Sequence, residues 1–339
     1  MTVRLIEQEQ EWESLVGQYA EANFLQSWAW GEFQESLGKQ VFRVAAFDDN
    51  QVILGLAEGI LEPAKRGAYL AIYGGPLLDW TNKPVLDAII GTLKELGKQN
   101  NCLFIRFRPQ QLESSELRNT VESLGAKPSP MHLTADLTLQ LDLTLSDEEL
   151  MAAMRKNHRS SIRKADKLGI TTTVSSDPQE MEEFYAHQLE LATRHKFVPF
   201  SKVFFTKQFE AFLKRGEVSF IHSRTAEGEL LASAFVIFYN SEAVYHYGVS
   251  TDANRSLPGS YAGQWRAIQE AKARGCTRYN FWGIAPEDQP NHRFAGVSLF
   301  KRGFGGMEIN YLPSHDIPLS NKYYLTWFFE KLRKKMRKL

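Results

Sequence analysis

The stretch SFIHSR (219–224) opens the pattern that decides the fold of this chain. It is followed by the turn Ala226-Glu227-Gly228, the strand-like runs ELLASAFVIFYN (229–240) and AVYHYGVS (243–250), a helical run at 259–274 and TRYNFWGI (277–284). An earlier part has the same layout: VFRVAAF (41–47), a turn at 48–50, VILGLAEGIL (52–61), AYLAIYGGP (68–76), a helical run at 83–96 and LFIRFRP (103–109). The order therefore occurs twice, within 41–141 and within 217–312, which predicts two related α+β domains. Because identity between the copies is low, a chance likeness of two ordinary α+β domains is the alternative.

Each helical run ends at a glycine, Gly97 or Gly275, and glycine suits a left-handed helix C-cap. Each glycine is followed by one of the two cysteines, close to the start of the next strand. The cysteines would therefore lie in different sheets, too far apart for a disulfide, and a reducing compartment is expected.

Length and charge fit two domains without a global basic field. The chain has 339 residues, with 40 Lys and Arg against 40 Asp and Glu. The N-terminus MTVRLIEQEQEW lacks an apolar signal core, and no apolar run approaches the roughly 18 residues of a membrane span. A monomeric cytoplasmic protein is expected.

We expect the domain boundary near 144–147, where Ser146 precedes three acidic residues that suit the start of a helix. This gives a first domain of 1–145 and a second of 146–339. The second would begin with a helix at 149–168, on which Arg155, Arg159 and Arg163 share one face, with Lys156 beside them. Such a stripe can bind phosphates, and a solvated helix face is the alternative.

A strand, loop, helix and further strand, occurring twice, resembles the architecture of the GCN5-related N-acetyltransferases (GNAT). In those enzymes a glycine-rich loop before the helix binds the pyrophosphate of acetyl-CoA with its backbone amides. Here the second copy has Arg255-Ser256-Leu257-Pro258-Gly259-Ser260 and the first has Pro76-Leu77-Leu78-Asp79-Trp80. Because both loops depart from the motif, acetyl-CoA is disfavoured as a donor and no cofactor is expected.

Several ordered motifs resemble the Fem family of peptidoglycan-bridge aminoacyltransferases (FemA, FemB and FemX type). The family's run M-x-x-K/N-x-R-x-x-I-R-x-A-x-x-x-G-I/V is matched by Met154, Arg159, Ile162, Arg163, Ala165, Gly169 and Ile170. FLQSWAW (24–30) is similar to its opening F-x-Q-S-x-x-W, GGPLLD (74–79) to its R-G-P-x-x-D turn, and LFKRGFGG (299–306) to F-K-x-G-F-G-G. The chain has no room for the long helical hairpin of the staphylococcal-type members, so it is more similar to the compact FemX type.

The resemblance implies two tandem GNAT-like domains without an inserted coiled-coil arm. It also implies transfer of an amino acid from aminoacyl-tRNA to the stem-peptide amine of UDP-MurNAc-pentapeptide or lipid II. The first domain would bind the acceptor, and the second would bind tRNA through Arg155, Lys156, Arg159 and Arg163. An N-acyltransferase that uses acyl-CoA, and a non-catalytic protein that binds tRNA or a cell-wall precursor, are the alternatives.

Aminolysis of an ester needs a neutral amine, a stabilised oxyanion and a proton for the leaving oxygen. Lys301, after Phe300, resembles the lysine of the family that is catalytic or binds a diphosphate. Phe300 and Lys301 are therefore the candidate catalytic residues. The alternative for Lys301 is an exposed lysine before a glycine-rich turn.

Four residues are expected at the acceptor. Asp79 is similar to an acid at the family's acceptor site, and Arg194 to an arginine that binds the acceptor's diphosphate. A helix cap and a surface arginine are the respective alternatives. Tyr245 and Tyr247 alternate along one strand, so both would project from one face; core packing is their alternative.

The histidines lack the spacing of metal ligands, so no metal site is expected. The tail YYLTWFFEKLRKKMRKL (323–339) joins aromatic residues to a basic run, which suits peripheral contact with the anionic inner leaflet of the membrane. The alternative is a final helix that docks its aromatic residues on the second domain.

Overall fold

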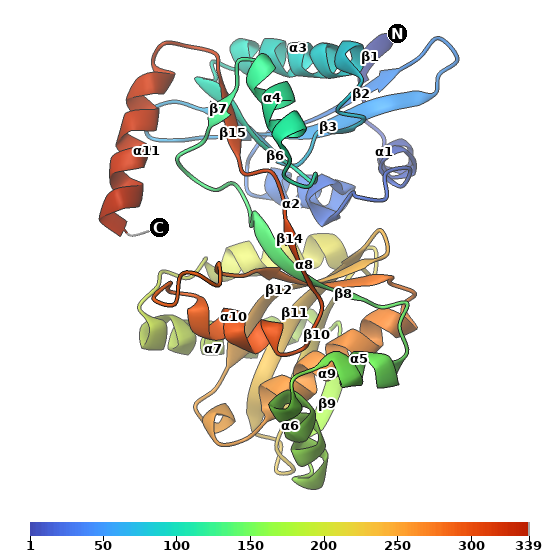
Figure 1. Cartoon of the computed structure of the whole chain (residues 1–339), viewed down its shortest axis with the longest axis vertical. Coiled ribbons are helices and arrows are strands. Elements are labelled where there is room, and N and C mark those ends of the chain that lie inside the picture. The colour runs from blue at the N-terminus through green and yellow to red at the C-terminus, as the bar shows by residue number, and fades with distance from the viewer. Residues whose placement is uncertain (338–339) are drawn as a thin grey trace. The chain divides into compact units, whose positions relative to one another are not determined.

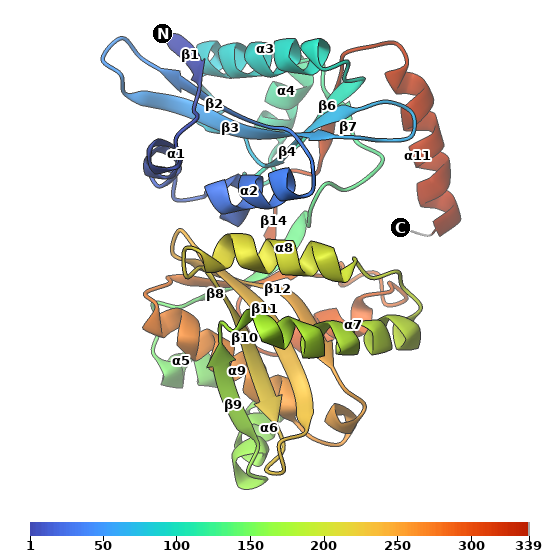
Figure 2. The ribbon, with the colours of Figure 1, turned by 180° about the vertical axis from the view of Figure 1, so that it is seen from behind.

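A computed structural model describes residues 1–337 of the chain. This part forms two compact units, Met1–Asp136 together with residues 310–337, and Leu137–Ile309. Each unit is built on one sheet, as Figures 1 and 2 show.

The sheet of the first unit has the strand order β1-β2-β3-β4-β6-β15-β7, with β5 paired to β3. Its strands are β1 (Thr2–Leu5), β2 (Val41–Phe47), β3 (Ile53–Glu62), β4 (Tyr69–Gly74), β5 (Leu77–Leu78), β6 (Phe104–Pro109), β7 (Lys127–Pro128) and β15 (His315–Pro318). Its helices are α1 (Glu9–Val16), α2 (Trp28–Ser36), α3 (Lys83–Gln99), α4 (Ser115–Ser123) and α11 (Tyr323–Arg337). All the pairs of this sheet are antiparallel except β4 with β6, which α3 connects.

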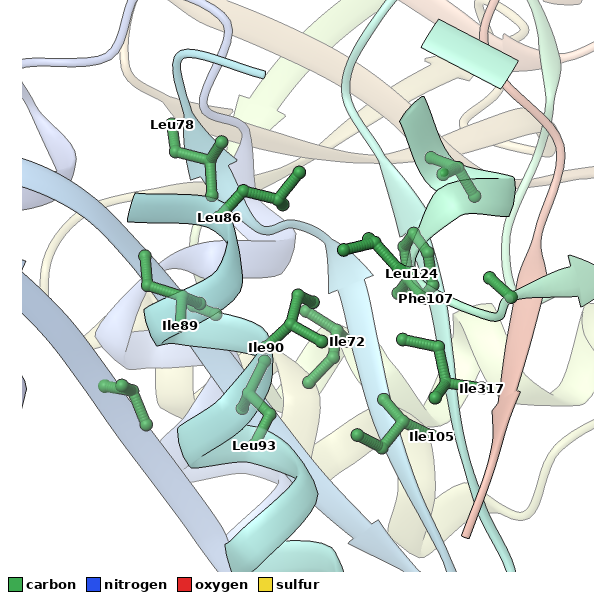
Figure 3. Close-up of a cluster of buried hydrophobic side chains, with 14 of the residues drawn as sticks. Ile72, Leu78, Leu86, Ile89, Ile90, Leu93, Ile105, Phe107, Leu124 and Ile317 are labelled. Atoms are coloured by element: carbon green, nitrogen blue, oxygen red, sulfur yellow. The ribbon is translucent and has the colours of Figure 1, made fainter. Parts of the chain in front are cut away.

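The core of the first unit lies between α3 and the sheet. Figure 3 shows Leu86, Ile89, Ile90 and Leu93 of α3 facing side chains of the strands, including Ile72 and Ile105. The spacing of three and four residues puts these α3 side chains on one helix face, as the sequence predicted. Asn82 caps the helix, because its side chain accepts a hydrogen bond from the backbone of Val85.

The sheet of the second unit has the order β14-β8-β13-β12-β11-β10-β9. Its strands are β8 (Leu137–Asp142), β9 (Thr171–Ser175), β10 (Val218–Arg224), β11 (Leu230–Tyr239), β12 (Glu242–Ser250), β13 (Arg278–Gly283) and β14 (Met307–Asn310). Its helices are α5 (Asp147–Ala153), α6 (Lys156–Lys167), α7 (Met181–His195), α8 (Lys202–Leu213), α9 (Gly259–Ala273) and α10 (Ala295–Arg302). Three antiparallel strands, β10, β11 and β12, are followed by α9 and by β13, which is parallel to β12. This repeats the order of β2, β3, β4, α3 and β6, so the duplicated layout predicted from the sequence is present.

The boundary differs from the sequence-based one, because two strands are placed in the sheet of the other copy. Strand β8, assigned to a first domain of 1–145, pairs with β13 in the second sheet. Strand β15, assigned to a second domain of 146–339, pairs with β6 and β7 in the first sheet. The boundary near 145 and the assignment of 310–339 to the second domain are therefore wrong.

Two helix predictions also change. The predicted helix at 149–168 is interrupted, because Met154 and Arg155 have extended ψ angles of 153° and 147° between α5 and α6. The final helix α11 docks on the first unit and not on the second, since Tyr323 packs with Leu103 and Phe104. In residues 1–337 the longest helices of the second unit, α7 and α9, have 15 residues each, so this range has no long helical hairpin there. None of the helices in that range is both long and apolar enough to cross a membrane.

Candidate active site

Lys301 lies near the end of α10 with only 7% of its surface exposed. Its Nζ donates a hydrogen bond of 2.7 Å to the carbonyl oxygen of Gly283 and lies 5.8 Å from the ring centre of Tyr245. Burial lowers the pKa of the Lys301 ammonium to about 7, because a buried charge loses its hydration. The sequence alternative of an exposed lysine is wrong, and the side chain can hold or release a proton near neutral pH.

The Nζ of Lys301 lies where two parallel strands separate. Strands β12 and β13 pair only from Glu242 with Arg278 to Val244 with Asn280. Tyr245 and Gly283, the two neighbours of the Lys301 Nζ, come after these last paired residues of their strands. The equivalent strands of the first unit, β4 and β6, stay paired over five positions, up to Gly74 with Pro109. The second unit therefore has an opening in its parallel pair that the first unit lacks.

A β-bulge at His246 separates the two candidate tyrosines. Val236 pairs with Tyr245 and Phe235 with Tyr247, so His246 is an extra residue of β12. Tyr245 packs with the cluster that contains Phe281 and Phe304, whereas the Tyr247 ring lies 4.9 Å from that of Phe205 in α8, on the other face. The prediction that Tyr245 and Tyr247 project from one face is wrong, because strand alternation fails at a bulge. Only Tyr245 lies beside Lys301.

The end of β13 has an unusual backbone. Trp282 has a φ of +63°, a conformation that bulky residues rarely adopt. Its N–H donates to Asn280 Oδ1 at 2.8 Å, and its ring meets that of His246 edge to face with centres 5.7 Å apart. This turn sets the direction of the next peptide, whose carbonyl oxygen accepts from Lys301. Nothing in the sequence FWG signals it, and rare backbone conformations of this kind occur often at functional sites.

The helix that carries Lys301 is joined to the basic helix α6. His158 Nε2 lies 2.8 Å from the carbonyl oxygen of Phe300, and the backbone N–H of Arg155 donates to the carbonyl of Gly303 at 2.9 Å. The Phe300 ring packs against those of His158, Tyr261 and Phe304. Phe300 therefore lies in a core that fixes α10, and its role as a catalytic residue remains a prediction.

The basic residues lie at and along the start of α6. Lys156, Arg163, Lys164 and Lys167 are exposed, and Arg155 is the N-cap residue. Arg159 is partly buried and donates hydrogen bonds to the carbonyls of Ala152 and Met154. Part of its hydrogen-bonding capacity therefore stabilises the break between α5 and α6. Cations at a helix N-terminus oppose the helix dipole, and the first turn of α6 has no acidic residue. The arrangement favours an anion near this helix end more than it favours the helix itself.

Asp79 and Arg194 already have partners. Asp79 is exposed, and its Oδ1 accepts from the N–H and hydroxyl of Thr81, which lowers the pKa of this carboxyl. Arg194 donates to Asp252 at 2.7 Å and to the carbonyl of Ser250 at 2.6 Å. Asp79 thus stabilises the turn before α3, although Asn82 is the helix cap, and Arg194 holds the end of β12. Their acceptor contacts remain predictions.

In the loop before α9, one backbone amide at the helix start is already bonded within the loop. Asn254 Oδ1 accepts from the N–H of Ser260 at 2.8 Å, and Asn254 Nδ2 donates to the Ser260 hydroxyl at 2.9 Å. A Cβ on Gly259 would lie 2.4 Å from the Cβ of Leu231, so this glycine is needed for packing. The Ser260 amide and the Gly259 position therefore serve the packing of this loop.

One family-like motif is structural. Gln26 of FLQSWAW is fully buried, its Nε2 donates to the carbonyl of Tyr73 at 2.6 Å, and its Oε1 accepts from the N–H of Glu58 at 2.8 Å. Gly74, which stands where the family often has arginine, has a φ of +68°. These residues hold β3 and β4 together.

Among residues 1–337, no group of three His, Cys, Asp or Glu side chains is arranged to hold a metal ion.

Two sheets, each with one parallel pair connected by a helix, define a protein of the tandem GNAT-like class. A tandem GNAT protein from the clavulanic acid pathway has this fold, with a TM-score of 0.58 and 11% identity over 94% of this chain and 99% of that chain. The chain belongs to the FemAB family, whose family model matches residues 8–221 and 214–331. The family and the fold predicted from the sequence are thus confirmed.

The relatives include named aminoacyltransferases. The crystal structure of FemX superposes with a TM-score of 0.87 and 18% identity, over 96% of this chain and 99% of that chain. The aminoacyltransferase FemA of Staphylococcus epidermidis is 23% identical, over 82% of this chain and 86% of its own length. The lipid II:glycine glycyltransferase of Staphylococcus aureus (strain USA300) is 20% identical, over 93% of this chain and 92% of its own length.

Proposed function

We propose that this protein transfers an amino acid from aminoacyl-tRNA to the stem-peptide amine of a peptidoglycan precursor. The observation that carries the proposal is the buried Lys301 Nζ, placed between Tyr245 and Gly283 where β12 and β13 separate. The family and the names of the relatives FemA and lipid II:glycine glycyltransferase support the same reaction class.

Lys301 suits the charge changes of ester aminolysis. The neutral acceptor amine attacks the ester carbonyl, whose oxygen becomes negative, and the bond from the carbonyl carbon to the ribose oxygen then breaks. The amine loses one proton and the ribose oxygen gains one. A Lys301 ammonium stabilises the oxyanion and gives its proton to the ribose oxygen, and the resulting neutral lysine takes the proton of the amine. A pKa of about 7 allows both steps near neutral pH.

The donor's phosphates are assigned to α6. Arg155, Lys156, Arg159 and Arg163 lie at its start or along it, and His158 connects this helix to α10. A tRNA bound there would have its backbone charge near the end of α10 that carries Lys301, because α6 contacts α10 at Phe300 and Gly303. The assignment relies on nonspecific phosphate attraction, which weakens as salt rises.

Asp79, Arg194 and Tyr245 are the proposed acceptor contacts, whereas Tyr247 packs against Phe205 on the other face of β12 from Tyr245 and is left out of this assignment. Tyr245 is supported by its contact with Lys301, and Asp79 by its exposed carboxylate. The proposed acceptor is UDP-MurNAc-pentapeptide or lipid II, so the protein acts in the cytoplasm and contacts the inner leaflet of the membrane when the acceptor is lipid-linked. It is proposed to act as a monomer.

The test is a transfer assay. The protein is incubated with a set of radiolabelled aminoacyl-tRNAs and with UDP-MurNAc-pentapeptide or lipid II, and labelled precursor is separated and counted. Transfer from one or more tRNAs supports the proposal. Transfer only from acyl-CoA would assign an N-acyltransferase instead, which the departure of the loop Arg255–Ser260 from the glycine-rich motif disfavours. Binding of tRNA or precursor without transfer would assign a binding protein.

The variant Lys301→Ala tests the proposed role of Lys301 in the same assay. It should lower the rate of transfer at least a hundredfold while the circular dichroism spectrum stays unchanged. Lys98→Ala removes an exposed lysine near the end of α3 and serves as the control, with an unchanged rate. A near-normal rate for Lys301→Ala would remove the proposed role of this residue.

A further inference from the structure

Helix α11 exposes an apolar stripe and docks through another side, which carries Tyr323, Thr326, Trp327 and Glu330. Leu325, Phe328, Leu332 and Met336 follow one another at spacings of three and four, so they form one stripe along the helix. All four are exposed, Leu325 by 59% and Phe328 by 54%, and Phe329 lies beside them at 40%. A surface helix ordinarily shows the reverse arrangement, with its apolar stripe toward the core.

The orientation of α11 is fixed by a buried charge network on its docked side. Glu330 accepts from Arg106 at 2.7 Å, and Arg106 binds Asp316 through two hydrogen bonds of 2.7 and 2.9 Å. Tyr323, 1% exposed, donates to the same aspartate at 3.2 Å. Rotating the helix to bury its apolar stripe would break the bonds of Glu330 with Arg106 and of Tyr323 with Asp316, and would remove Tyr323 from its contacts with Leu103 and Phe104, which is costly. The exposure of the stripe is therefore a property of the docked helix.

Basic side chains border the exposed stripe. Lys322 and Arg333 lie on one side of it by helical spacing, and Lys331 and Lys335 on the other. Two cations from elsewhere in the first unit join them: Arg66 stacks on the Phe329 ring at 4.3 Å, and Lys127 lies 4.8 Å from the Tyr324 ring. The one acid of α11 within the described residues, Glu330, is paired with Arg106 on the docked side of the helix, away from the exposed stripe. This surface, which we call the α11 face, is apolar along its middle and positive at its edges.

We propose that the α11 face binds the surface of an anionic lipid bilayer. An apolar stripe that enters the lipid, with lysine and arginine side chains at its borders, is the arrangement of an interfacial helix. Long basic side chains can reach lipid phosphates while their stems remain among the apolar groups. Figures 1 and 2 show α11 at the end of the first unit opposite α1, beside the turn between β3 and β4 that carries Arg66.

Charge favours a lipid surface over a second copy of this chain. Pairing two α11 faces would bring two sets of cations together, and like charges at close range repel. A nucleic acid would satisfy the cations but would leave the stripe of Leu325, Phe328, Leu332 and Met336 without an apolar partner. The inference rests on the proposed function for one point only, the identity of the membrane, which is the one that contains a lipid-linked acceptor. The test of the inference needs no acceptor.

The test is flotation of the full chain with vesicles. Vesicles of phosphatidylglycerol and phosphatidylcholine in equal parts are compared with vesicles of phosphatidylcholine alone, at 0.05 and 0.5 M salt. We expect at least tenfold more bound protein on the anionic vesicles at low salt and a clear loss at high salt, because surface charge is screened. Equal binding to both vesicle types, or none to either, would overturn the proposal.

The double variant Leu325→Ser with Phe328→Ser should reduce vesicle binding at least tenfold. Both side chains are exposed, so the thermal midpoint should stay unchanged. Val52→Ser, 55% exposed in the turn between β2 and β3 of the same unit, is the matched control and should bind like the unchanged chain. Light scattering without vesicles should show a monomer, and a dimer abolished by the double variant would overturn the proposal in favour of self-association. Transfer to soluble UDP-MurNAc-pentapeptide should persist in the double variant, so the proposal and the proposed function can fail separately.

Discussion

The Nε2 atom of His158 lies 2.8 Å from the carbonyl oxygen of Phe300, and this contact joins the basic helix α6 to the helix that carries Lys301. A carbonyl oxygen only accepts, so Nε2 carries the hydrogen. Burial lowers the pKa of His158 and favours its neutral form. The imidazole is thus a positioning group, since it contacts the backbone of α10 and not Lys301.

Gly303→Ala should disrupt this joint. An added Cβ would lie 1.8 Å from His158 Cε1 and 2.0 Å from Nε2, so the ring must move away from Phe300. We expect a loss of stability of about 1 to 3 kcal/mol by denaturant unfolding and at least a tenfold lower transfer rate. Gly296→Ala, in the same helix, is the control: its Cβ meets nothing within 4 Å, and it should raise stability by up to about 1 kcal/mol at an unchanged rate. Equal behaviour of the two variants would contradict the role of the joint.

The contrast between these two glycines shows which parts of the site a sequence can predict. Phe300 and Lys301 are candidates because LFKRGFGG resembles a motif of the family, and the basic residues of 155–163 are candidates because of their helical spacing. Lys301 lies in α10, and the basic residues lie at the start of α6 or along it. For His158 the sequence indicates only that it lacks the spacing of a metal ligand, and for Trp282 it indicates no role. Their roles depend on segments brought together by folding, and on a backbone φ, neither of which has a local sequence pattern.

The errors in the predicted fold have the same cause, because they too depend on contacts between segments that are distant in the sequence. The helices and strands follow from periodicity, and the two copies were found from their order. The placement of β8 and β15 in each other's expected sheet depends on pairing between strands as distant as Arg106 and Asp316. The β-bulge at His246 moved Tyr247 to the opposite face, which strict alternation could not predict.

Lys301→Met should stabilise the protein, and more at pH 6 than at pH 9. The pKa of Lys301 is about 7 in the folded chain against 10.5 in its ordinary state. Between these values the unfolded chain binds a proton that the folded chain does not, so stability rises with pH through this window. Methionine has no proton to bind, so the variant does not show this pH dependence. The amount by which its unfolding free energy exceeds that of the unchanged protein should therefore be larger at pH 6 than at pH 9, by on the order of 2 kcal/mol. Equal gains in the unfolding free energy at both pH values would show that the lysine is not desolvated as described.

The transfer rate at saturating substrate should fall as pH rises above about 7. The proposed chemistry needs the Lys301 ammonium for the oxyanion, and its pKa of about 7 means that this form is lost through that pH. A pH profile of the single-turnover rate, measured from pH 5.5 to 9, checks this. A rate that keeps rising to pH 9 would indicate that the neutral amine of Lys301 acts as a base without an ammonium step.

Gln26→Leu should cost about 2 to 4 kcal/mol of unfolding free energy. The buried Gln26 amide bonds both the N–H of Glu58 in β3 and the carbonyl of Tyr73 in β4, and leucine leaves both groups unsatisfied. Gln18→Leu, which removes an exposed amide with one long contact of 3.4 Å, is the control and should change stability by less than about 0.5 kcal/mol. Urea unfolding of both variants measures the difference. A cost for Gln26→Leu no larger than that of the control would mean that water replaces the lost contacts.

Arg163→Glu should weaken binding of aminoacyl-tRNA about tenfold at 0.1 M salt and reduce the salt dependence of that binding, because fewer cations are released when fewer phosphates are neutralised. Arg163 is exposed on α6, so its replacement should leave the thermal midpoint and the binding of the cell-wall precursor unchanged. Lys196→Glu makes the same charge change at an exposed position after α7, away from α6, and serves as the control. Filter binding of tRNA from 0.05 to 0.4 M salt gives both the affinity and the slope. If Lys196→Glu weakens binding as much as Arg163→Glu does, net charge and not the position on α6 determines tRNA affinity, and the assignment of the phosphates to this helix fails.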